Sequence, residues 1–428
     1  MKRNGIRLSN GGRLALGFAT IIALGTILLY LPVSHRNGES LSFINSLFIA
    51  TSAVCVTGLT PVDISQVLNA FGTTVMMVLF QIGGLGYAVI ASAIVSIRNG
   101  QMDLRSRAML KDSFGADNST GASTLLKTAM LVVIAVEMLG TLVLAIPFSS
   151  QYGIARGIYI ALFTSISAFN NAGFDLFSTS LISYSSDPLV IITVSILIVL
   201  GGLGFVFYLE LFTHRKGSKF SIQSKVIASM TLALILIGFL YFRFSCSLDW
   251  LDALFQSVTS RTAGFASIDQ GTLTNSGMMV TIILMYIGAS PGSTGGGIKT
   301  TSFFTAIHSS ICLLLGREPV LFKRRVSSES VMRALELIAI SLIVMGLAFT
   351  VLTITDPGIP FENLLFETVS AFATVGLSIN TTPLLSLGGR MTIILLMYIG
   401  RVGILTIITS FTMPKKQVSY LEERIAIG

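Results

Sequence analysis

Four short segments of the sequence share one pattern, and each ends at a glycine. They read LFIATSAVCVTGL, LFTSISAFNNAGF, LFQSVTSRTAGF and LFETVSAFATVGL, and end at Gly58, Gly173, Gly264 and Gly376 or one residue beyond. Glycine tolerates left-handed backbone dihedrals and has no side chain, so four such loops can converge on one axis. Inward-pointing carbonyl oxygens can replace the water that a dehydrated alkali cation loses. The pattern predicts a cation filter; the alternative is that the glycines are ordinary turn residues.

The predicted ion-binding residues are each glycine and the two residues before it. They are Val56, Thr57 and Gly58; Asn171, Ala172 and Gly173; Thr262, Ala263 and Gly264; and Thr374, Val375 and Gly376. Because their side chains differ, the ring is only pseudo-symmetric and selectivity should rest on backbone oxygens. Arg261, just before the third set, would repel a permeating cation, so we expect it behind the filter, paired with a carboxylate. The candidate carboxylates are Asp252, Glu362 and Glu367.

A second glycine motif follows each filter glycine at intervals of 25, 28, 24 and 24 residues, beginning at Gly83, Gly201, Gly288 and Gly400. In the first two copies, Gly-Gly-x-Gly favours close helix packing. The third copy continues as a run that cannot remain regular helix. Its residues are Gly288, Ala289, Ser290, Pro291, Gly292, Ser293, Thr294, Gly295, Gly296 and Gly297. We expect a broken helix inside the membrane here, and small side chains with few packing contacts favour mobility.

Two charged residues fall on helices that we expect to be embedded in the membrane, Lys299 and Arg401. Charges are costly there unless paired or hydrated, so both are functional candidates. For Lys299 the alternative is a side chain that extends to the cytoplasmic surface. We expect Arg401 to extend toward the cavity, to hydrogen-bond loop carbonyls and to add an electrostatic barrier when the pathway is shut.

The composition is that of a membrane protein, with 52% hydrophobic and 11% charged residues and a mean hydropathy of +0.82. Long apolar stretches such as 125–148 and 335–354 can each cross a hydrocarbon core of ~30 Å as a helix. The segments before the filter glycines are different: ~12 residues of helix rise only ~18 Å, so they must enter and return on the same side. Their expected ranges are 43–54, 158–169, 251–260 and 362–372. Non-helical backbone at membrane depth survives only where it lines a cavity, which implies a central aqueous path.

The predicted fold is an all-α integral membrane protein with four pseudo-symmetric repeats. Each repeat has a spanning helix, a re-entrant pore half-helix with its filter loop, and a second spanning helix, giving eight spanning helices around one central pore. The repeats cover residues 12–97, 123–213, 222–315 (with the interrupted gate helix) and 329–412, and a C-terminal tail covers 413–428. All belong to one transmembrane domain.

Charge distribution predicts the orientation. The net charge is +8, and basic residues gather at the N-terminus, near 98–111, 215–225 and 317–333, and at the C-terminus. By the positive-inside tendency these segments and both termini are cytoplasmic. The opposite segments are acidic, and negative potential at an outer mouth concentrates cations, although any single carboxylate could simply be a solvated loop residue.

The four loops, the run from Ser290 to Lys299 and the motif Gly400-Arg401-Val402-Gly403 together resemble the Trk/Ktr/HKT superfamily of potassium transporters, over nearly the whole chain. The resemblance implies potassium uptake across the cell membrane, because glycine at all four filter positions goes with potassium selectivity. It also implies that 288–297 is an intramembrane loop that obstructs the pore beneath the filter. The early start of the first repeat and the tail at 422–428 are similar to a Ktr-type membrane subunit.

That subfamily forms homodimers on a cytosolic ring of nucleotide-binding regulatory subunits. The resemblance therefore implies a nucleotide on the partner subunit only, and the 317–333 loop is our candidate dock. Three dispersed cysteines and three isolated histidines indicate neither a disulfide framework nor a resident metal site. Potassium is the expected substrate, with sodium as activator or co-transported ion, and the charge pattern gives no reason to expect nucleic acid.

Two other classes of function remain to be compared. An ion-coupled secondary transporter with a midplane site also uses broken helices, but such folds often invert successive repeats, whereas these repeats share one orientation. A channel-like pore and a potassium symporter stay open alternatives. A membrane enzyme is disfavoured, because the sequence has no close pair of intramembrane acids, no histidine cluster and no nucleophile with a base.

Overall fold

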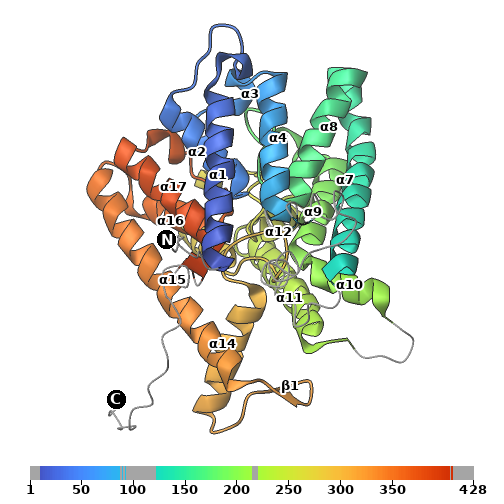
Figure 1. Cartoon of the computed structure of the whole chain (residues 1–428), viewed down its shortest axis with the longest axis vertical. Helices are drawn as coiled ribbons and strands as arrows, with labels where there is room; N and C mark the ends of the chain where they lie inside the picture. The colour runs from blue at the N-terminus through green and yellow to red at the C-terminus, as the bar shows by residue number, and fades with distance from the viewer. Residues whose placement is uncertain are drawn as a thin grey trace, which may run out of the picture.

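The computed structural model describes residues 10–86, 122–214 and 220–404, together with 89, 92, 406 and 407. Within these residues the protein is helical apart from one small hairpin. Helices from the two ends of the chain, α1 (Asn10–Tyr30) and α17 (Leu387–Val402), lie side by side (Figure 1). The basic segment 98–111, residues 215–219 and the predicted tail 413–428 fall outside the described residues.

Four single helices are long and apolar enough to cross a membrane. They are α1, α7 (Ala122–Tyr152), α11 (Ile222–Phe244) and α15 (Ser328–Thr355). Large apolar side chains on their outer faces are exposed, as at Leu139 and Leu142 of α7. Such a continuous exposed apolar face is stable in lipid and not in water.

A shorter helix follows each long one and leads into a glycine-ended loop. These helices are α2 (Phe43–Val54), α8 (Ile154–Phe169), α12 (Trp250–Thr259) and α16 (Phe361–Ala373). Their positions confirm the four predicted short helices, and α8 begins four residues earlier than expected. The longest has 16 residues, or ~24 Å, which is less than the ~30 Å of a bilayer core.

The last helix of each repeat is short or broken. These helices are α4 (Ala70–Leu85), α9 (Pro188–Leu203) with α10 (Phe205–Thr213), α13 (Asn275–Tyr286) with α14 (Thr300–Leu314), and α17. The break between α9 and α10 is a bend of 85° at Gly204, whose φ of +93° ends the helix. Within the described residues there are four spans, or five with α9 and α10 as one, so the count of eight stays a prediction.

Contacts between neighbouring repeats close a ring. The last helix of one repeat contacts the short helix of the next, in the pairs α4 with α8, α9 with α12, α13 with α16, and α17 with α2. Because the fourth pair returns to the first repeat, the four glycine-ended loops must surround a common axis.

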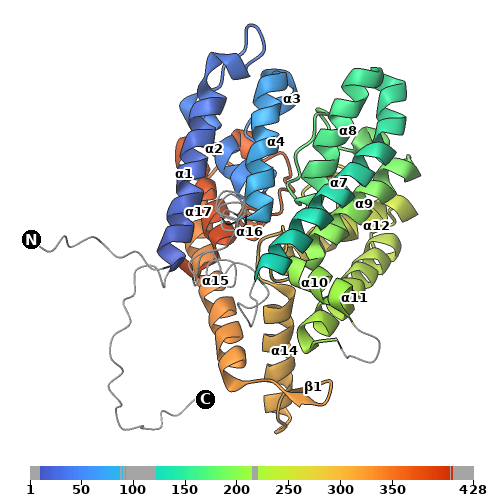
Figure 2. The same cartoon turned by 45° about the vertical axis from the view of Figure 1, so that its right-hand side comes forward.

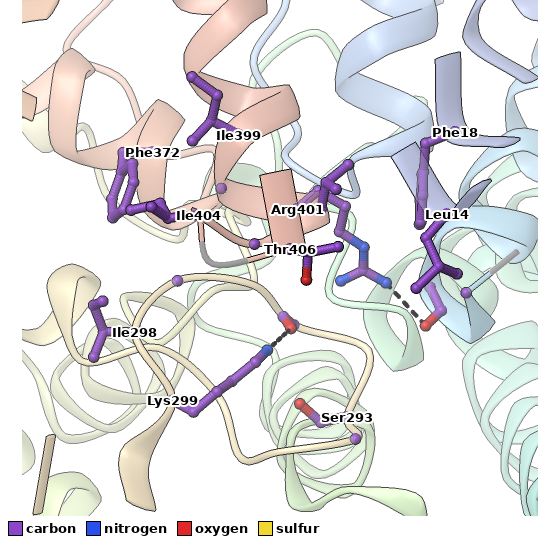
Figure 3. A pocket seen from close by; sticks show the side chains of 18 of the residues that line it. Leu14, Phe18, Ser293, Ile298, Lys299, Phe372, Ile399, Arg401, Ile404 and Thr406 are labelled. Atoms are coloured by element: carbon purple, nitrogen blue, oxygen red, sulfur yellow. Dashed lines mark hydrogen bonds between the residues drawn. The ribbon is translucent and has the colours of Figure 1, made fainter. Parts of the chain in front are cut away.

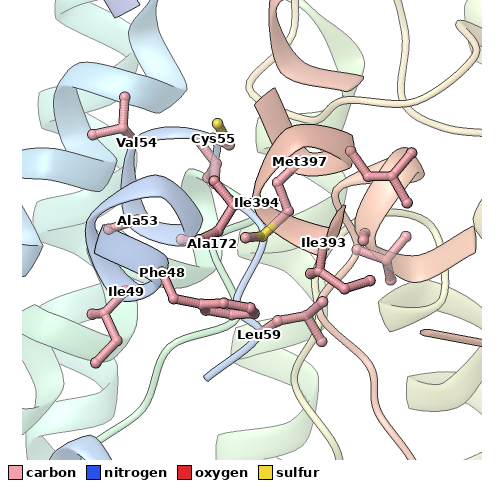
Figure 4. Close-up of a cluster of buried hydrophobic side chains, with 14 of the residues drawn as sticks. Phe48, Ile49, Ala53, Val54, Cys55, Leu59, Ala172, Ile393, Ile394 and Met397 are labelled. Carbon is pink, nitrogen blue, oxygen red and sulfur yellow. The ribbon is translucent and has the colours of Figure 1, made fainter. Parts of the chain in front are cut away.

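The buried apolar side chains form two main groups. The first lies mainly on α1, α2, α4, α16 and α17 and the second mainly on α7, α8 and α9; Figure 2 shows these helices in blue and red on one side and in green on the other. The first group joins repeats one and four, and Figure 4 shows Phe48 of α2 extending toward Ile393 and Met397 of α17. Aromatic contacts connect repeats one and two, with ring centroids of Phe80 and Phe163 5.4 Å apart in an edge-on arrangement. Inside a bilayer the hydrophobic effect does not drive helices together, because lipid tails are as apolar as the side chains. Close van der Waals packing of this kind holds the helices together instead.

The remaining elements are short. They are the helical turns Pro32–Ser34, Ile182–Tyr184, Gln270–Thr272 and Thr382–Leu384, the helix α3 (Ile64–Val67), and the strands β1 (Val320–Leu321) and β2 (Arg324–Arg325). The two strands pair as an antiparallel hairpin at the tip that α14 and α15 form (Figure 1).

Candidate functional site

The four predicted glycines lie against one another around a single axis. A Cβ added to Gly58 would lie 2.7 Å from the carbonyl oxygen of Ala172, and one added to Gly173 would lie 2.7 Å from that of Ala263. The same relation joins Gly264 to Val375, at 2.3 Å. It also joins Gly376 to Thr57, at 2.0 Å, which closes the ring. No side chain fits at these four positions without moving a backbone.

The four loops share one backbone conformation. All four glycines have positive φ, between +70° and +99°. The residues two positions earlier are also left-handed: Val56 at 57°, Asn171 at 56°, Thr262 at 85° and Thr374 at 51°. A left-handed conformation costs an L-residue roughly 1–2 kcal/mol, and a β-branched residue such as Val56 adopts it rarely. Four occurrences at equivalent positions indicate a conformation that the site requires.

Hydroxyl groups from the short helices hold these loops. Ser52 and Ser370 accept hydrogen bonds from the backbone N–H groups of Gly58 and Gly376, each at 3.1 Å, and Ser167 accepts one from Phe174 at 3.0 Å. In the third repeat Thr259 donates to the carbonyl of Phe265 at 2.6 Å. These four hydroxyl residues are not among the residues predicted from the sequence. The signal was present, because each is the fifth residue after the leucine that opens its segment.

A cavity of about 510 Å³ opens on one side of the ring and is lined by all four glycines. Asp63, Asp175 and Asp269 also line it. Each accepts a hydrogen bond from a backbone N–H two residues later, at 2.9, 2.8 and 3.0 Å respectively. The negative charge of Asp63 and Asp269 makes this cavity attractive to cations.

The predicted gate segment lies on the other side of the ring. A Cβ on Gly295 would lie 2.3 Å from the hydroxyl of Thr262, and one on Gly296 would lie 2.0 Å from that of Thr374. Thr294 donates from its side chain to the carbonyl of Phe169 at 3.0 Å, so the segment is bonded to the second repeat as well. The run therefore sits directly against the bases of the loops.

Backbone hydrogen bonds fix the two ends of this run. Gly288 donates to the carbonyl of Ile298 at 2.9 Å, which folds the run back on itself. Ser290 donates to Gly202 at 3.1 Å, and Phe205 donates to Gly292 at 2.9 Å. The intermediate residues Ala289, Pro291, Ser293 and Gly297 lie between these anchors.

Lys299 and Arg401 both line a cavity of about 250 Å³ beside the gate segment. Figure 3 shows Arg401 entering from α17 and Lys299 from the loop. Lys299 donates to the carbonyl of Gly295 at 2.7 Å, so in this structure its side chain binds the loop. Arg401 donates to the carbonyls of Thr294, Gly83 and Gly84, the last at 3.0 Å. One guanidinium thus links the predicted gate segment to the end of α4. The sequence predicted its bond to a loop carbonyl, but not its bonds to α4.

In three repeats the first glycine of the second motif lies against the C-terminal end of the short helix of the same repeat. A Cβ on Gly83 would lie 2.1 Å from the carbonyl oxygen of Val54, one on Gly201 1.8 Å from that of Phe169, and one on Gly400 1.9 Å from that of Phe372. These carbonyls lie four residues before the filter glycines of the same repeats. The packing interpretation of the first two motifs is confirmed. In the third repeat the gate segment takes this place, and Gly288 meets the carbonyl of Gly296 instead, at 2.3 Å.

The predicted ion pair of Arg261 is wrong. In the described part of the chain, ion pairs join only Arg325 with Glu318 and Arg333 with Glu329. Asp252 instead accepts a hydrogen bond from Ser267 at 2.6 Å, and Glu367 accepts one from Ser378 at 2.8 Å; Glu362 is exposed. The pair does not form because the Arg261 side chain lies beside a small cavity next to α9 and α11, and so does not reach the outer carboxylates.

A buried polar cluster that includes Glu137 lies behind the second loop and was not predicted from the sequence. Asn170 donates to Gln81 at 2.6 Å and to Glu137 at 3.1 Å, and Gln81 donates to Glu137 at 3.2 Å. These residues come from α8, α4 and α7, so the cluster fixes the base of the second loop to the first repeat.

Comparisons with known proteins match the chain to cation transport proteins. A family model described as TrkH, cation transport protein, matches residues 15–246 and 246–421. The Ktr system potassium uptake protein B of Bacillus subtilis (strain 168) is 39% identical, over 97% of this chain and 96% of that protein. The potassium/sodium uptake protein NtpJ of Enterococcus hirae is 36% identical, over 100% of this chain and 99% of that protein.

A solved structure has the same fold. The crystal structure of the potassium transporter TrkH from Vibrio parahaemolyticus aligns with a TM-score of 0.76, covering 96% of this chain and 87% of that chain. Sequence identity in the alignment is 17%, so the likeness concerns the fold alone.

Proposed function

Since this chain belongs to the TrkH family of cation transport proteins, we propose that it carries potassium ions into the cell along the axis of the four loops. The observation that carries the proposal is the closed ring, in which each filter glycine meets the carbonyl preceding the next. Backbone oxygens from four equivalent loops give a stripped alkali cation the ligands that it needs. The names of the relatives as potassium uptake proteins support potassium as the ion. The chain is a transport protein and not an enzyme.

We further propose that the segment from Gly288 to Gly297 closes this path, with Lys299 and Arg401. The position of the segment supports this proposal, because the segment lies against Thr262 and Thr374 at the bases of two loops. The two cationic side chains line the same cavity and would raise the electrostatic barrier to a cation. Opening then requires the segment to move and the Arg401 hydrogen bonds to break.

The assembly is proposed from the resemblance. A homodimer would rest on a cytosolic ring of nucleotide-binding regulatory subunits, with both termini cytoplasmic and the chain in the cell membrane. The Bacillus subtilis relative is named as protein B of a Ktr system, which supports further components. The hairpin of β1 and β2, with Lys323, Arg324 and Arg325, is the proposed dock. Sodium acts as an activator or second ion, which the name of the Enterococcus relative supports.

The test is cation flux into liposomes that contain the purified chain, measured separately for potassium, rubidium and sodium. Wild type should prefer potassium and rubidium, and Gly58→Ser should lose this preference, because its side chain would meet the carbonyl of Ala172. Gly38→Ser is the matched control, since Gly38 has a φ of +90° but nothing within 4 Å of an added Cβ. An unchanged preference in Gly58→Ser, or no potassium flux in wild type, would contradict the proposal.

A further inference from the structure

A small cavity lies beside the third loop, between α9, α11 and α12. Arg261, Thr231, Gly202 and Ala289 line it, together with Asn171 and four apolar residues: Ile198, Val199, Ile235 and Val258. Its volume is about 10 Å³, which is near the space that one water-sized particle needs. Ala289 belongs to the gate segment, so the cavity touches both the second loop and the gate.

Two polar side chains that line this cavity are buried without partners. Arg261 and Thr231 are each 8% exposed. The Nε atom of Arg261 and the hydroxyl oxygen of Thr231 have no hydrogen-bond partner in the part of the chain that the structure describes. A guanidinium group stays charged in proteins, and a buried charge is strongly unfavourable unless a counter-charge accompanies it.

The described residues provide no full counter-charge. The carboxylates of Asp252 and Glu367 are held by hydroxyl groups elsewhere, and both ion pairs lie at the cytoplasmic tip. Arg261 follows the C-terminal end of α12, which offers about half an elementary charge of negative sign. A water molecule would supply hydrogen bonds but no charge. About half of the positive charge of Arg261 is therefore left without a counter-charge.

We propose that this cavity binds one small monovalent anion, of the chloride class, with Arg261 supplying the charge and Thr231 an O–H donor. The apolar walls from Val199 and Ile235 exclude a large or strongly hydrated anion. Binding stabilises the folded protein, because a ligand that binds only the native state shifts the folding equilibrium by mass action. The proposal of an anion site does not rest on the cation path proposed above, although Asn171 and Ala289 line the cavity.

The direct test is diffraction from the purified protein in sodium bromide, using the anomalous signal of bromide. We expect one peak between Arg261 and Thr231 in wild type. We also expect the melting temperature to rise with chloride, and not with gluconate, at constant potassium and ionic strength. Neither measurement depends on transport, so both stand if the proposed cation path fails.

Three variants sharpen this test. Arg261→Gln should abolish both the peak and the chloride effect. Gly202→Ala keeps the charge of Arg261 but narrows the cavity. Its new methyl group would meet only Asn171, at 3.7 Å, so the protein should still fold. We expect the apparent affinity for chloride to fall at least about tenfold. Arg390→Gln is the control, since Arg390 bonds Asn45 and Pro383, and it should respond to chloride like wild type.

Several results would overturn the proposal. One is density for water alone in wild-type crystals grown in bromide. Another is an adventitious ion elsewhere with none at Arg261. The third is a chloride effect that is equal in wild type, Arg261→Gln and Gly202→Ala.

Discussion

The α-carbon of Gly376 faces the carbonyl oxygen of Thr57, so closely that an added Cβ would lie 2.0 Å from this oxygen. This relation brings the last loop of the chain against the first and completes the ring. The two residues do not meet because they are neighbours in the sequence, since they are 319 positions apart in a chain of 428 residues. The ring depends on the packing of α17 against α2, which the apolar cluster shared by repeats one and four provides.

The first prediction concerns this closing contact. Gly376→Ala should lower the potassium-to-sodium flux ratio about tenfold or more, equivalent to ~1.4 kcal/mol of ion discrimination for each factor of ten. The methyl group must displace the Thr57 carbonyl or strain a residue at φ +97°. Flux ratios in liposomes measure the effect. Gly38→Ala has the same kind of strain without the contact and should keep the wild-type ratio, so an equal loss in both variants would assign the effect to strain alone.

A second prediction concerns the hydroxyl groups that hold the loops. Ser52→Ala leaves the N–H of Gly58 without its partner, at a cost of ~1–3 kcal/mol, and should loosen the first loop. We expect a lower melting temperature and a higher sodium leak. Ser46→Ala is the control, because Ser46 lies in the same helix and donates to Ser42 at 3.1 Å without touching a loop. If both variants leak sodium equally, the Ser52 hydrogen bond is not what shapes the loop.

Repetition made the core of the fold predictable. Four copies of one segment are a local signal, and the helix lengths set by the bilayer are another, so the ranges of α2, α8, α12 and α16 followed from the sequence within four residues. The convergence of the four glycines followed from the same repetition. The bend at Gly204 did not, because Gly-Gly-x-Gly indicates close helix packing and does not show that its last glycine adopts a left-handed conformation, as Gly86 and Gly204 both do.

Partners across the structure were harder to predict. The spacing of residues does not say which carbonyl an arginine will meet, so Arg261 was assigned a carboxylate that the structure places elsewhere, whereas Arg401 was expected at loop carbonyls and lies there. Similarly, Glu137 gave no signal of its role, since its partners Gln81 and Asn170 come from two other helices.

A third prediction tests the second glycine motif. Gly400→Ala should destabilise the protein by ~1–3 kcal/mol or more, because the methyl would lie 1.9 Å from the carbonyl oxygen of Phe372 in a packed interior. Gly346→Ala in α15 should instead stabilise the protein. Nothing lies within 4 Å of an added Cβ at this position, and alanine is more favourable than glycine in a helix by up to ~1 kcal/mol. Thermal unfolding in detergent should move in opposite directions for the two variants. A shift of the same sign would contradict the packing explanation.

The last prediction concerns Arg401. Arg401→Ala removes the link between the carbonyl of Thr294 and those of Gly83 and Gly84, so the gate segment loses its connection to α4. It also removes a positive charge from the cavity beneath the loops. Both changes lower the barrier to potassium permeation, and we expect a raised potassium leak in liposomes without any regulatory subunit.

Arg401→Lys keeps the charge, but a single ammonium group cannot reproduce the planar fork of a guanidinium. It should give an intermediate leak if both effects contribute. Arg390→Ala is the control: it removes an arginine from the other end of α17 and should leave the potassium leak at the wild-type level. If Arg401→Ala leaves flux and its regulation unchanged in the same assay, Arg401 has no part in the gate.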